Sequence, residues 1–210
     1  LAPITELNLE SSIALSGTVV ATGQAPGGVE LHQPQINVIT PVTEPTPVPL
    51  QQKRLKAGLP TLLDHAVVAN RHPLRQAVFR LAAGVMTGFR ATLTAEHFTE
   101  IQAPKLVASA TESGANVFKL EYFGGDAFLA QSPQFYKQIM VGVFGRVFEV
   151  GPVFRAEPHD TTRHVNEYVS LDVEFGFIEN HFTVMGMVRT VLAGIFQALA
   201  NEYGSELALL

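Results

Sequence analysis

Residues 154–175 read FRAEPHDTTRHVNEYVSLDVEF. The first five and the last eight residues have the composition of β-strands, and a polar loop rich in charge, histidine and threonine lies between them. This pattern predicts a β-hairpin whose strands span residues 146–157 and 167–178. A hairpin requires only a turn and one apolar face, so this stretch carries more polar side chains than its fold needs.

Side chains alternate along a strand, so the second half of this stretch has two distinct faces. One face is apolar and carries Val169, Leu171, Val173 and Phe175. The other carries Tyr168, Ser170, Asp172 and Glu174. If the hairpin pairs across its loop, Arg155 and Glu157 lie on this second face. Periodicity alone leaves two interpretations open: a solvent-facing sheet side, or a floor that binds a charged, planar ligand.

The residues before the hairpin predict a short helix with polar groups on one face. In QSPQFYKQ, residues 131–138, Ser132-Pro133 is a typical helix start, and the helix should continue to about Val141. Gln134 and Lys137 are three residues apart and therefore share a helix face. Taken alone, this segment is better explained as an ordinary exposed helical turn.

Further elements surround these two. Pro73 should begin a long helix that ends near Ala95, with an apolar stripe of Leu74, Val78, Leu81, Val85, Phe89 and Leu93. We expect strands at 98–107 (interrupted by Pro104), 117–122 and 127–130, with a turn at 124–126. A flexible loop, SATESGAN, should cover 109–116, and an amphipathic helix should cover 182–202 and stop at Gly204. Because the strands cluster as hairpins, the fold class is predicted to be α+β with antiparallel sheets.

The N-terminal region has a different character. Residues 11–40 predict three short strands, which fit part of a small β-barrel. A proline-rich segment follows and should act as a linker or an extended hinge. We therefore predict three regions: a partial barrel at 1–40, a hinge at 41–63 and a larger domain at 64–210.

Composition sets the general class of the protein. The 210 residues have a formal net charge of -5 and no cysteine, which excludes disulfides and thiolate metal sites. No apolar run is long enough to span a bilayer, so we expect a cytoplasmic protein without membrane contact. The chain begins without methionine and ends after an apolar run, and we expect it to be part of a longer protein.

Taken together, segments of this sequence resemble the class II aminoacyl-tRNA synthetases, and specifically the aspartyl-tRNA synthetases. EHFTEIQAP, residues 96–104, is similar to motif 1 of that family, although glycine is common where His97 stands. Residues 154–175 resemble motif 2 over many positions. The resemblance runs from about residue 64 to 185 and extends more weakly through the N-terminal strands. It implies a partial class II catalytic domain preceded by part of an OB-fold anticodon-binding barrel.

Three features of the resemblance indicate aspartate as the amino acid. QSPQFYKQ is similar to the aspartate-binding helix of the family. Asp172 stands where asparaginyl enzymes typically carry glutamate. TTRHVNEY, residues 161–168, resembles the archaeal and eukaryotic branch rather than the bacterial type. The implied activity is aspartate–tRNA ligase, which forms aspartyl-adenylate from aspartate and ATP and transfers the amino acid to tRNA(Asp).

The resemblance also implies roles for individual residues. Arg155 would act in catalysis by binding both the α-phosphate and the aspartate carboxylate. The implied ATP contacts are Arg155, Ala156, Glu157, Arg163, His164, Val165 and Tyr168, with Tyr168 stacking on adenine in place of the usual phenylalanine. The implied aspartate contacts are Glu112, Gln134, Lys137, Arg155 and Asp172, with Lys137 neutralising the substrate side chain.

Other implications concern partners and parts outside these residues. Motif 3 and the acidic ligands of Mg²⁺ are absent from the 210 residues, so the cofactors ATP and Mg²⁺ would be bound with the help of downstream residues, and no metal ligand is assigned here. A homodimer is implied. Pro26 resembles the non-discriminating type of enzyme, which also charges tRNA(Asn), although a simple tight turn explains this proline equally well.

Two other functions are also compatible with the resemblance to this family. An aspartate-activating paralogue that makes free asparagine would share Gln134, Lys137 and Arg155, but it would lack the N-terminal strands. A non-catalytic module that only binds tRNA or a protein would not need to keep Arg155, Glu157, His164 and Asp172 together.

Overall fold

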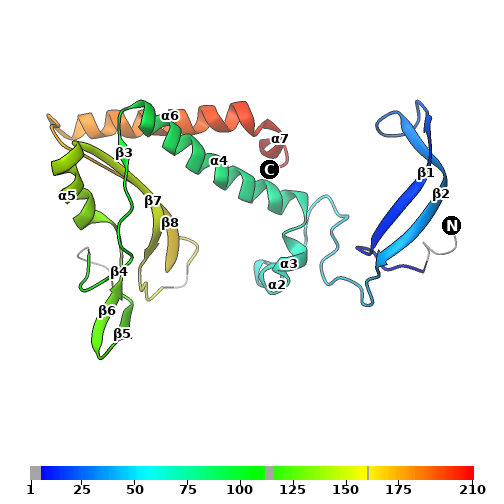
Figure 1. Ribbon diagram of the computed structural model, residues 1–210, viewed down its shortest axis with the longest axis horizontal. Coiled ribbons are helices and arrows are strands. Elements are labelled where there is room, and N and C mark those ends of the chain that lie inside the picture. The colour runs from blue at the N-terminus through cyan, green and yellow to red at the C-terminus, as the bar shows by residue number, and fades with distance from the viewer. Residues whose placement is uncertain (1–5, 112–115, 160) are drawn as a thin grey trace. The chain divides into compact units, whose positions relative to one another are not determined.

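The computed structural model describes residues 6–111, 116–159 and 161–210 (Figure 1). The chain divides into two compact units, Leu1–Gln76 and Ala77–Leu210. Each unit is described by itself below. Glu112, which the resemblance assigns to aspartate binding, lies outside the described residues.

The first unit begins with a two-stranded antiparallel ribbon made of β1 (Ser12–Ala21) and β2 (Val29–Thr40). The prediction of three strands is wrong, because its second and third strands are one continuous element. Gln33 has a left-handed φ of 51° at a register shift, and pairing with β1 resumes on both sides of it. A bulge of this kind interrupts the sequence pattern without ending the strand.

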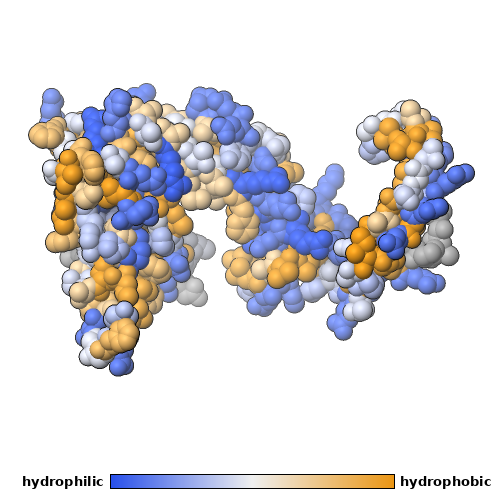
Figure 2. Space-filling view, in the orientation of Figure 1, coloured by the Kyte–Doolittle hydropathy of each residue, from blue (hydrophilic) through white to orange (hydrophobic). Residues whose placement is uncertain are grey.

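A turn joins the two strands and contains Pro26. The Thr22 amide donates to the Gly28 carbonyl at 2.9 Å, and the Gly28 amide donates to Ala25 at 3.0 Å. Gly27 and Gly28 both have positive φ, which glycine adopts without steric cost. Pro26 is exposed at the tip. Apolar residues of the ribbon are also exposed, as the orange surface of this segment in Figure 2 shows.

The proline-rich segment packs against two short helices, α2 (Leu59–Asp64) and α3 (Ala66–Ala69). Val48 is completely buried and forms a small apolar cluster with Leu62 and Ala69. This segment is therefore anchored at its middle rather than extended throughout its length.

The second unit contains a three-stranded sheet in the order β3-β7-β8. Its strands are β3 (Thr99–Glu100), β7 (Arg146–Phe154) and β8 (Glu167–Phe175). The antiparallel pairing of β7 with β8 confirms the predicted hairpin, and each strand ends three residues earlier than predicted. However, β3 runs parallel to β7, so the sheet is mixed and not purely antiparallel as predicted.

A second three-stranded sheet has the order β4-β6-β5. Its strands are β4 (Leu106–Val107), β5 (Lys119–Tyr122) and β6 (Gly125–Leu129). The single strand predicted at 98–107 is therefore wrong, because β3 and β4 belong to different sheets with Pro104 between them. The turn between β5 and β6 is shorter than predicted and consists of Phe123 and Gly124, both with positive φ.

Helices α4 (Pro73–Ala95) and α6 (His181–Glu202) pack against the β3-β7-β8 sheet (Figure 1). The predicted bounds of α4 are confirmed. After α4, His97 has φ 63°, a conformation favoured by glycine, which accounts physically for the glycine common at this position of motif 1. The core cluster contains Phe89, Leu93, Phe98, Phe148, Val150, Val191, Ile195 and Leu199.

Glycines allow α4 and α6 to approach closely. A Cβ atom on Gly88 would lie 3.0 Å from the Ile195 Cα atom, and one on Gly84 would lie 2.8 Å from a Leu199 methyl carbon. The predicted apolar stripe of α4 is therefore only part of its buried face, since Val78 is half exposed while both glycines are buried.

Helix α6 ends at Glu202 with Tyr203 as its C-cap, which confirms the predicted end before Gly204, and a short helix, α7 (Gly204–Leu207), then follows. By length and composition alone, the 22 residues of α6 could cross a membrane, so the expectation that no apolar run is long enough was wrong. A core helix of a soluble protein meets the same criterion, and Val191, Ile195 and Leu199 of α6 lie in the core.

Helix α5 (Gln134–Phe144) lies against β7 and β8. It extends three residues beyond the predicted end because its apolar residues continue to Phe144. Gly145, with φ 76°, then ends the helix, and its amide donates to the Val141 carbonyl at 2.8 Å. The helix thus places Gln134 and Lys137 beside the sheet.

Candidate active site

The register of the hairpin determines which side chains share its polar face. Glu149 lies directly opposite Asp172, and Val153 lies opposite Tyr168. Directly opposed residues of an antiparallel pair project to the same side. The face that carries Tyr168, Ser170, Asp172 and Glu174 is therefore continuous with the odd-numbered residues of β7. The alternate face packs on the core through Phe148, Val150, Leu171 and Val173. The two-faced hairpin predicted from periodicity is confirmed.

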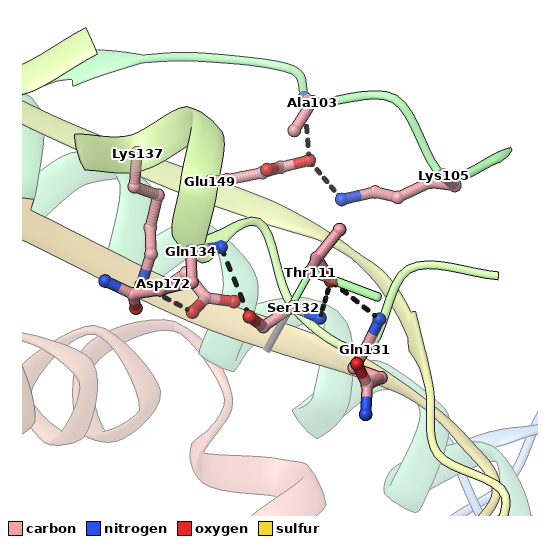
Figure 3. Close-up of polar contacts among 9 residues, drawn as sticks. All are labelled: Ala103, Lys105, Thr111, Gln131, Ser132, Gln134, Lys137, Glu149 and Asp172. Atoms are coloured by element: carbon pink, nitrogen blue, oxygen red, sulfur yellow. Dashed lines mark hydrogen bonds and ion pairs between the residues drawn. The ribbon is translucent and has the colours of Figure 1, made fainter. Parts of the chain in front are cut away.

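One end of this polar face is built around Lys137. Its side chain is buried, with 5% of the residue exposed, and its Nζ lies 3.0 Å from Asp172 Oδ1 and 3.5 Å from Glu174 Oε2. Gln134 Nε2 is also 3.5 Å from Glu174 Oε2. Figure 3 shows the Lys137 side chain extending from α5 to Asp172. The structure therefore brings together three predicted aspartate contacts and adds Glu174, which sequence reasoning had left out of the site.

Hydrogen bonds fix the start of α5 at this end. Pro133 is the N-cap of the helix and has no side-chain cap bond, but Ser132 Oγ, one residue earlier, accepts from the Gln134 amide at 3.2 Å. Thr111 Oγ1 in turn accepts from the Gln131 amide at 3.2 Å and the Ser132 amide at 3.4 Å (Figure 3). The segment that leads into 112–115 is thus attached to the helix that carries Lys137.

The other end of the face forms a small cavity of about 290 Å³. Its lining consists of Arg155, Glu157, Arg163, His164, Val165 and Tyr168. These are six of the seven predicted ATP contacts. The seventh, Ala156, has its amide bonded to the Asn116 carbonyl at 3.0 Å. The structure brings the seven residues together, and their contact with ATP stays a prediction.

The loop of the hairpin contributes histidines to this second end. Thr161 Oγ1 and His164 Nδ1 are 2.7 Å apart, and the ring of His159 lies edge-on to that of His164 at 5.1 Å between centroids. Both histidines are exposed. Together with Arg155 and Arg163, they provide several nitrogen donors for an anionic ligand.

Two further residues of the site were missed by sequence reasoning. Glu149 is buried on the polar face, and its Oε1 lies 2.6 Å from Lys105 Nζ. Alternation along residues 146–154 could have placed Glu149 on one face. Its partner could not have been found, because Lys105 is 44 residues away and is brought near only by the fold.

A larger cavity, of about 430 Å³, lies around the free edge of β8. Lys137 and Asp172 border it, but the rest of its lining is apolar and comes largely from α6. Lys137 and Asp172, which belong to the polar face, are therefore the only charged side chains in its lining within the part of the chain that the structure describes. Among the described residues, no group of three or more His, Asp or Glu side chains could hold a metal ion.

Comparisons with known proteins agree with this geometry. Residues 59–208 match the sequence profile of the tRNA synthetases class II (D, K and N). An aspartate–tRNA(Asp/Asn) ligase of Deinococcus radiodurans is 48% identical over 201 residues, which are 96% of this chain and 46% of the relative. The ligase of the same name from Thermus thermophilus is 44% identical over 201 residues, with 96% and 48% covered.

Solved structures give the same result. The crystal structure of asparaginyl-tRNA synthetase from Pyrococcus horikoshii, complexed with asparaginyl-adenylate, superposes with a TM-score of 0.88 and 30% identity. The match covers 99% of this chain and 47% of that structure. This chain spans about half the length of the curated relatives it matches. By its sequence and its catalytic fold, the chain belongs to the class II tRNA synthetases of the D, K and N group.

Proposed function

We propose that this chain carries the aspartate- and ATP-binding half of an aspartate–tRNA ligase. The observation that carries the proposal is the position of Lys137, a buried cation that faces Asp172 and Glu174 on one polar floor. A buried ammonium group offers a partner for the side-chain carboxylate of aspartate, and the two carboxylates offer acceptors for its ammonium group. The names of the relatives support this choice of amino acid.

In the proposed reaction, an oxygen of the aspartate α-carboxylate attacks the α-phosphorus of ATP. A new carboxylate–phosphorus bond forms, and the bond to the leaving pyrophosphate breaks. Arg155 is the residue of the chain best suited to assist this step, because its planar fork of donors matches phosphate oxygens and carboxylates. Catalysis rests on positioning and on stabilisation of the charge that spreads over the phosphorus oxygens.

The remaining ATP contacts are proposed from the cavity of about 290 Å³ at the other end of the polar face. Glu157 would accept from the adenine amino group, and Tyr168 would stack against the ring. Arg163 and His164, on the hairpin loop, would approach the phosphates. Magnesium is also part of the proposal, but the described residues do not form a site that fits it, so no step is assigned to the metal.

Transfer to tRNA is the second half of the proposed activity. The ribbon β1–β2 is proposed to be part of an OB-fold anticodon-binding barrel, since its exposed apolar residues need further strands to cover them. We propose that both tRNA(Asp) and tRNA(Asn) are charged. Pro26 and the two glycines after it present no side-chain donor that could reject the wrong anticodon base. A cytoplasmic homodimer is the expected form.

Pyrophosphate exchange and aminoacylation by the full-length gene product test these statements separately. Aspartate should support exchange of pyrophosphate into ATP, and asparagine should not. Exchange that depends on asparagine instead would favour an asparaginyl enzyme, the kind of protein named for a structure of similar fold. Formation of free asparagine without tRNA would favour the paralogue. Separate tRNA(Asp) and tRNA(Asn) transcripts should both be charged, and a preference above about 100-fold would assign discrimination to other residues.

A further inference from the structure

We infer that the Lys105–Glu149 ion pair sets the charge of the amino-acid end of the site, which is the end of the polar face around Lys137, and that Lys105 is a specificity-determining residue for an anionic amino acid. This inference rests on the proposed function and extends it to two residues outside the predicted site. It concerns a contact between the segment that follows β3 and the middle of β7.

Glu149 is the buried member of this ion pair, whereas the Lys105 side chain is 21% exposed. Glu149 is 1% exposed, and its Oε1 accepts from Lys105 Nζ at 2.6 Å and from the Ala103 amide at 3.2 Å (Figure 3). Glu149 Oε2 is also buried, and no described residue provides a hydrogen-bond partner for it. The carboxylate therefore depends on Lys105 for its charge compensation. Removing one member of such a pair leaves an uncompensated buried charge, which is costly.

The backbone around the pair holds it in place. The Lys105 carbonyl accepts from the Ala130 amide at 2.9 Å, and the Ile101 amide donates to the Phe148 carbonyl at 2.8 Å. Gly151 leaves room above the strand, because a Cβ atom there would lie 3.1 Å from Glu149 Oε1 and 3.4 Å from Lys105 Cε. Lys105 thus reaches Glu149 across the polar face of the sheet.

The pair lies beside the proposed aspartate contacts. Glu149 is directly opposite Asp172, and neighbouring strands are about 4.8 Å apart. Tyr168, at the proposed ATP end, lies four residues further along β8, or about 13 Å. A change of charge at the pair should therefore act on the amino acid much more strongly than on ATP.

Charge balance gives the pair its proposed role. At the amino-acid end, the ammonium groups of Lys105 and Lys137 face the carboxylates of Glu149, Asp172 and Glu174. Carboxylates are already in excess. Loss of Lys105 would add a further uncompensated carboxylate next to a dicarboxylate substrate, whereas loss of the Glu149 charge would leave a cation that attracts the substrate.

The test compares Lys105→Met, Glu149→Gln and the double variant in aspartate-dependent pyrophosphate exchange by the full-length gene product. Lys105→Met should raise the KM for aspartate roughly tenfold and leave the KM for ATP within about twofold. Glu149→Gln, which keeps an oxygen for both hydrogen bonds, should lower the KM for aspartate. The double variant should return close to the wild-type value, and Lys105→Arg should retain it.

A merely structural role has a different signature. Both single variants would then raise the KM for aspartate in the same direction, or would raise both KM values together with a fall in melting temperature. Either result overturns the inference, as does a double variant that is no better than Lys105→Met. Absence of aspartate-dependent exchange in the wild-type protein would instead overturn the proposed function itself, so the two failures are distinguishable.

Discussion

The charged side chains at the two ends of the polar face differ in their burial and in their ion pairing within the protein. At the proposed amino-acid end, Lys137 and Glu149 are buried, and both form ion pairs with partners on other elements. At the other end, Arg163 and His164 are exposed on a loop, and they line an open cavity with Arg155 and Glu157.

This difference indicates two ways of binding a charged ligand. Paired charges in a buried environment are already oriented, so a ligand of the wrong charge disturbs an existing balance and is rejected. Exposed donors on a loop can adapt to a flexible polyphosphate, but they lose side-chain entropy when they bind. We therefore expect the amino-acid end to provide selectivity and the other end to provide binding and catalysis for ATP.

The largest expected effect comes from Arg155, the proposed catalytic residue at the open end. Arg155→Ala should lower kcat/KM for aspartate-dependent exchange on the order of 10²-fold or more, because a donor to the transition state is lost. Arg155→Lys keeps the charge but not the fork and should recover only part of the activity. Near-normal exchange by the alanine variant would remove Arg155 from the mechanism.

Lys137 should show a smaller and more selective effect at the buried end. Lys137→Ala should weaken aspartate binding by about 2 kcal/mol, or roughly 30-fold, because a carboxylate loses its buried partner. ATP binding should change little. Calorimetric titration of each ligand measures both effects.

Lys119 offers a matched control for that variant. It forms an ion pair with Asp126 at 2.9 Å, but both side chains are more than half exposed. An exposed pair contributes little, so Lys119→Ala should leave both affinities unchanged. If the two lysine variants behave alike, burial is not what gives Lys137 its selectivity.

Tyr168 tests whether the open end binds adenine. Tyr168→Ala should raise the KM for ATP about fivefold or more, because stacking of a base on an aromatic ring contributes about 1–3 kcal/mol. Tyr168→Phe retains the ring and should bind ATP normally. A rise in the KM for aspartate alone would place the adenine elsewhere.

The smallest effect is expected from Glu206, which lies in α7, away from both ends. Hydrogen bonds from the Ser205 hydroxyl at 2.6 Å and from Arg80 at 3.0 Å lower the pKa of this carboxyl group. Its contribution to stability is thus present at neutral pH and is lost as the pH falls through the lowered pKa.

Thermal melting of Glu206→Gln and the wild type measures this contribution. The difference in melting temperature should be modest at pH 7 and should shrink in acid, while the KM values for aspartate and ATP stay the same. A difference that is constant with pH would mean that the charge of Glu206 does not contribute.

The sequence by itself determined the local features of this protein. The two faces of residues 168–175 follow from alternation, the shared face of Gln134 and Lys137 follows from helical spacing, and the start of α4 follows from Pro73. Each depends on residues close together in the chain, where backbone geometry dictates direction. These local features were sufficient to place Gln134, Lys137 and Asp172 on one helix and one hairpin, and their contact with aspartate stays a prediction.

Only the tertiary structure decided which distant segments meet. Residues 98–107 have the composition of a single strand, yet β3 pairs with β7 and β4 pairs with β6. Glu149 lies opposite Asp172 and binds Lys105 because of strand register and the path of the segment after β3. Contacts across 21 to 48 residues depend on the free energy of packing the whole domain, so no local pattern encodes them.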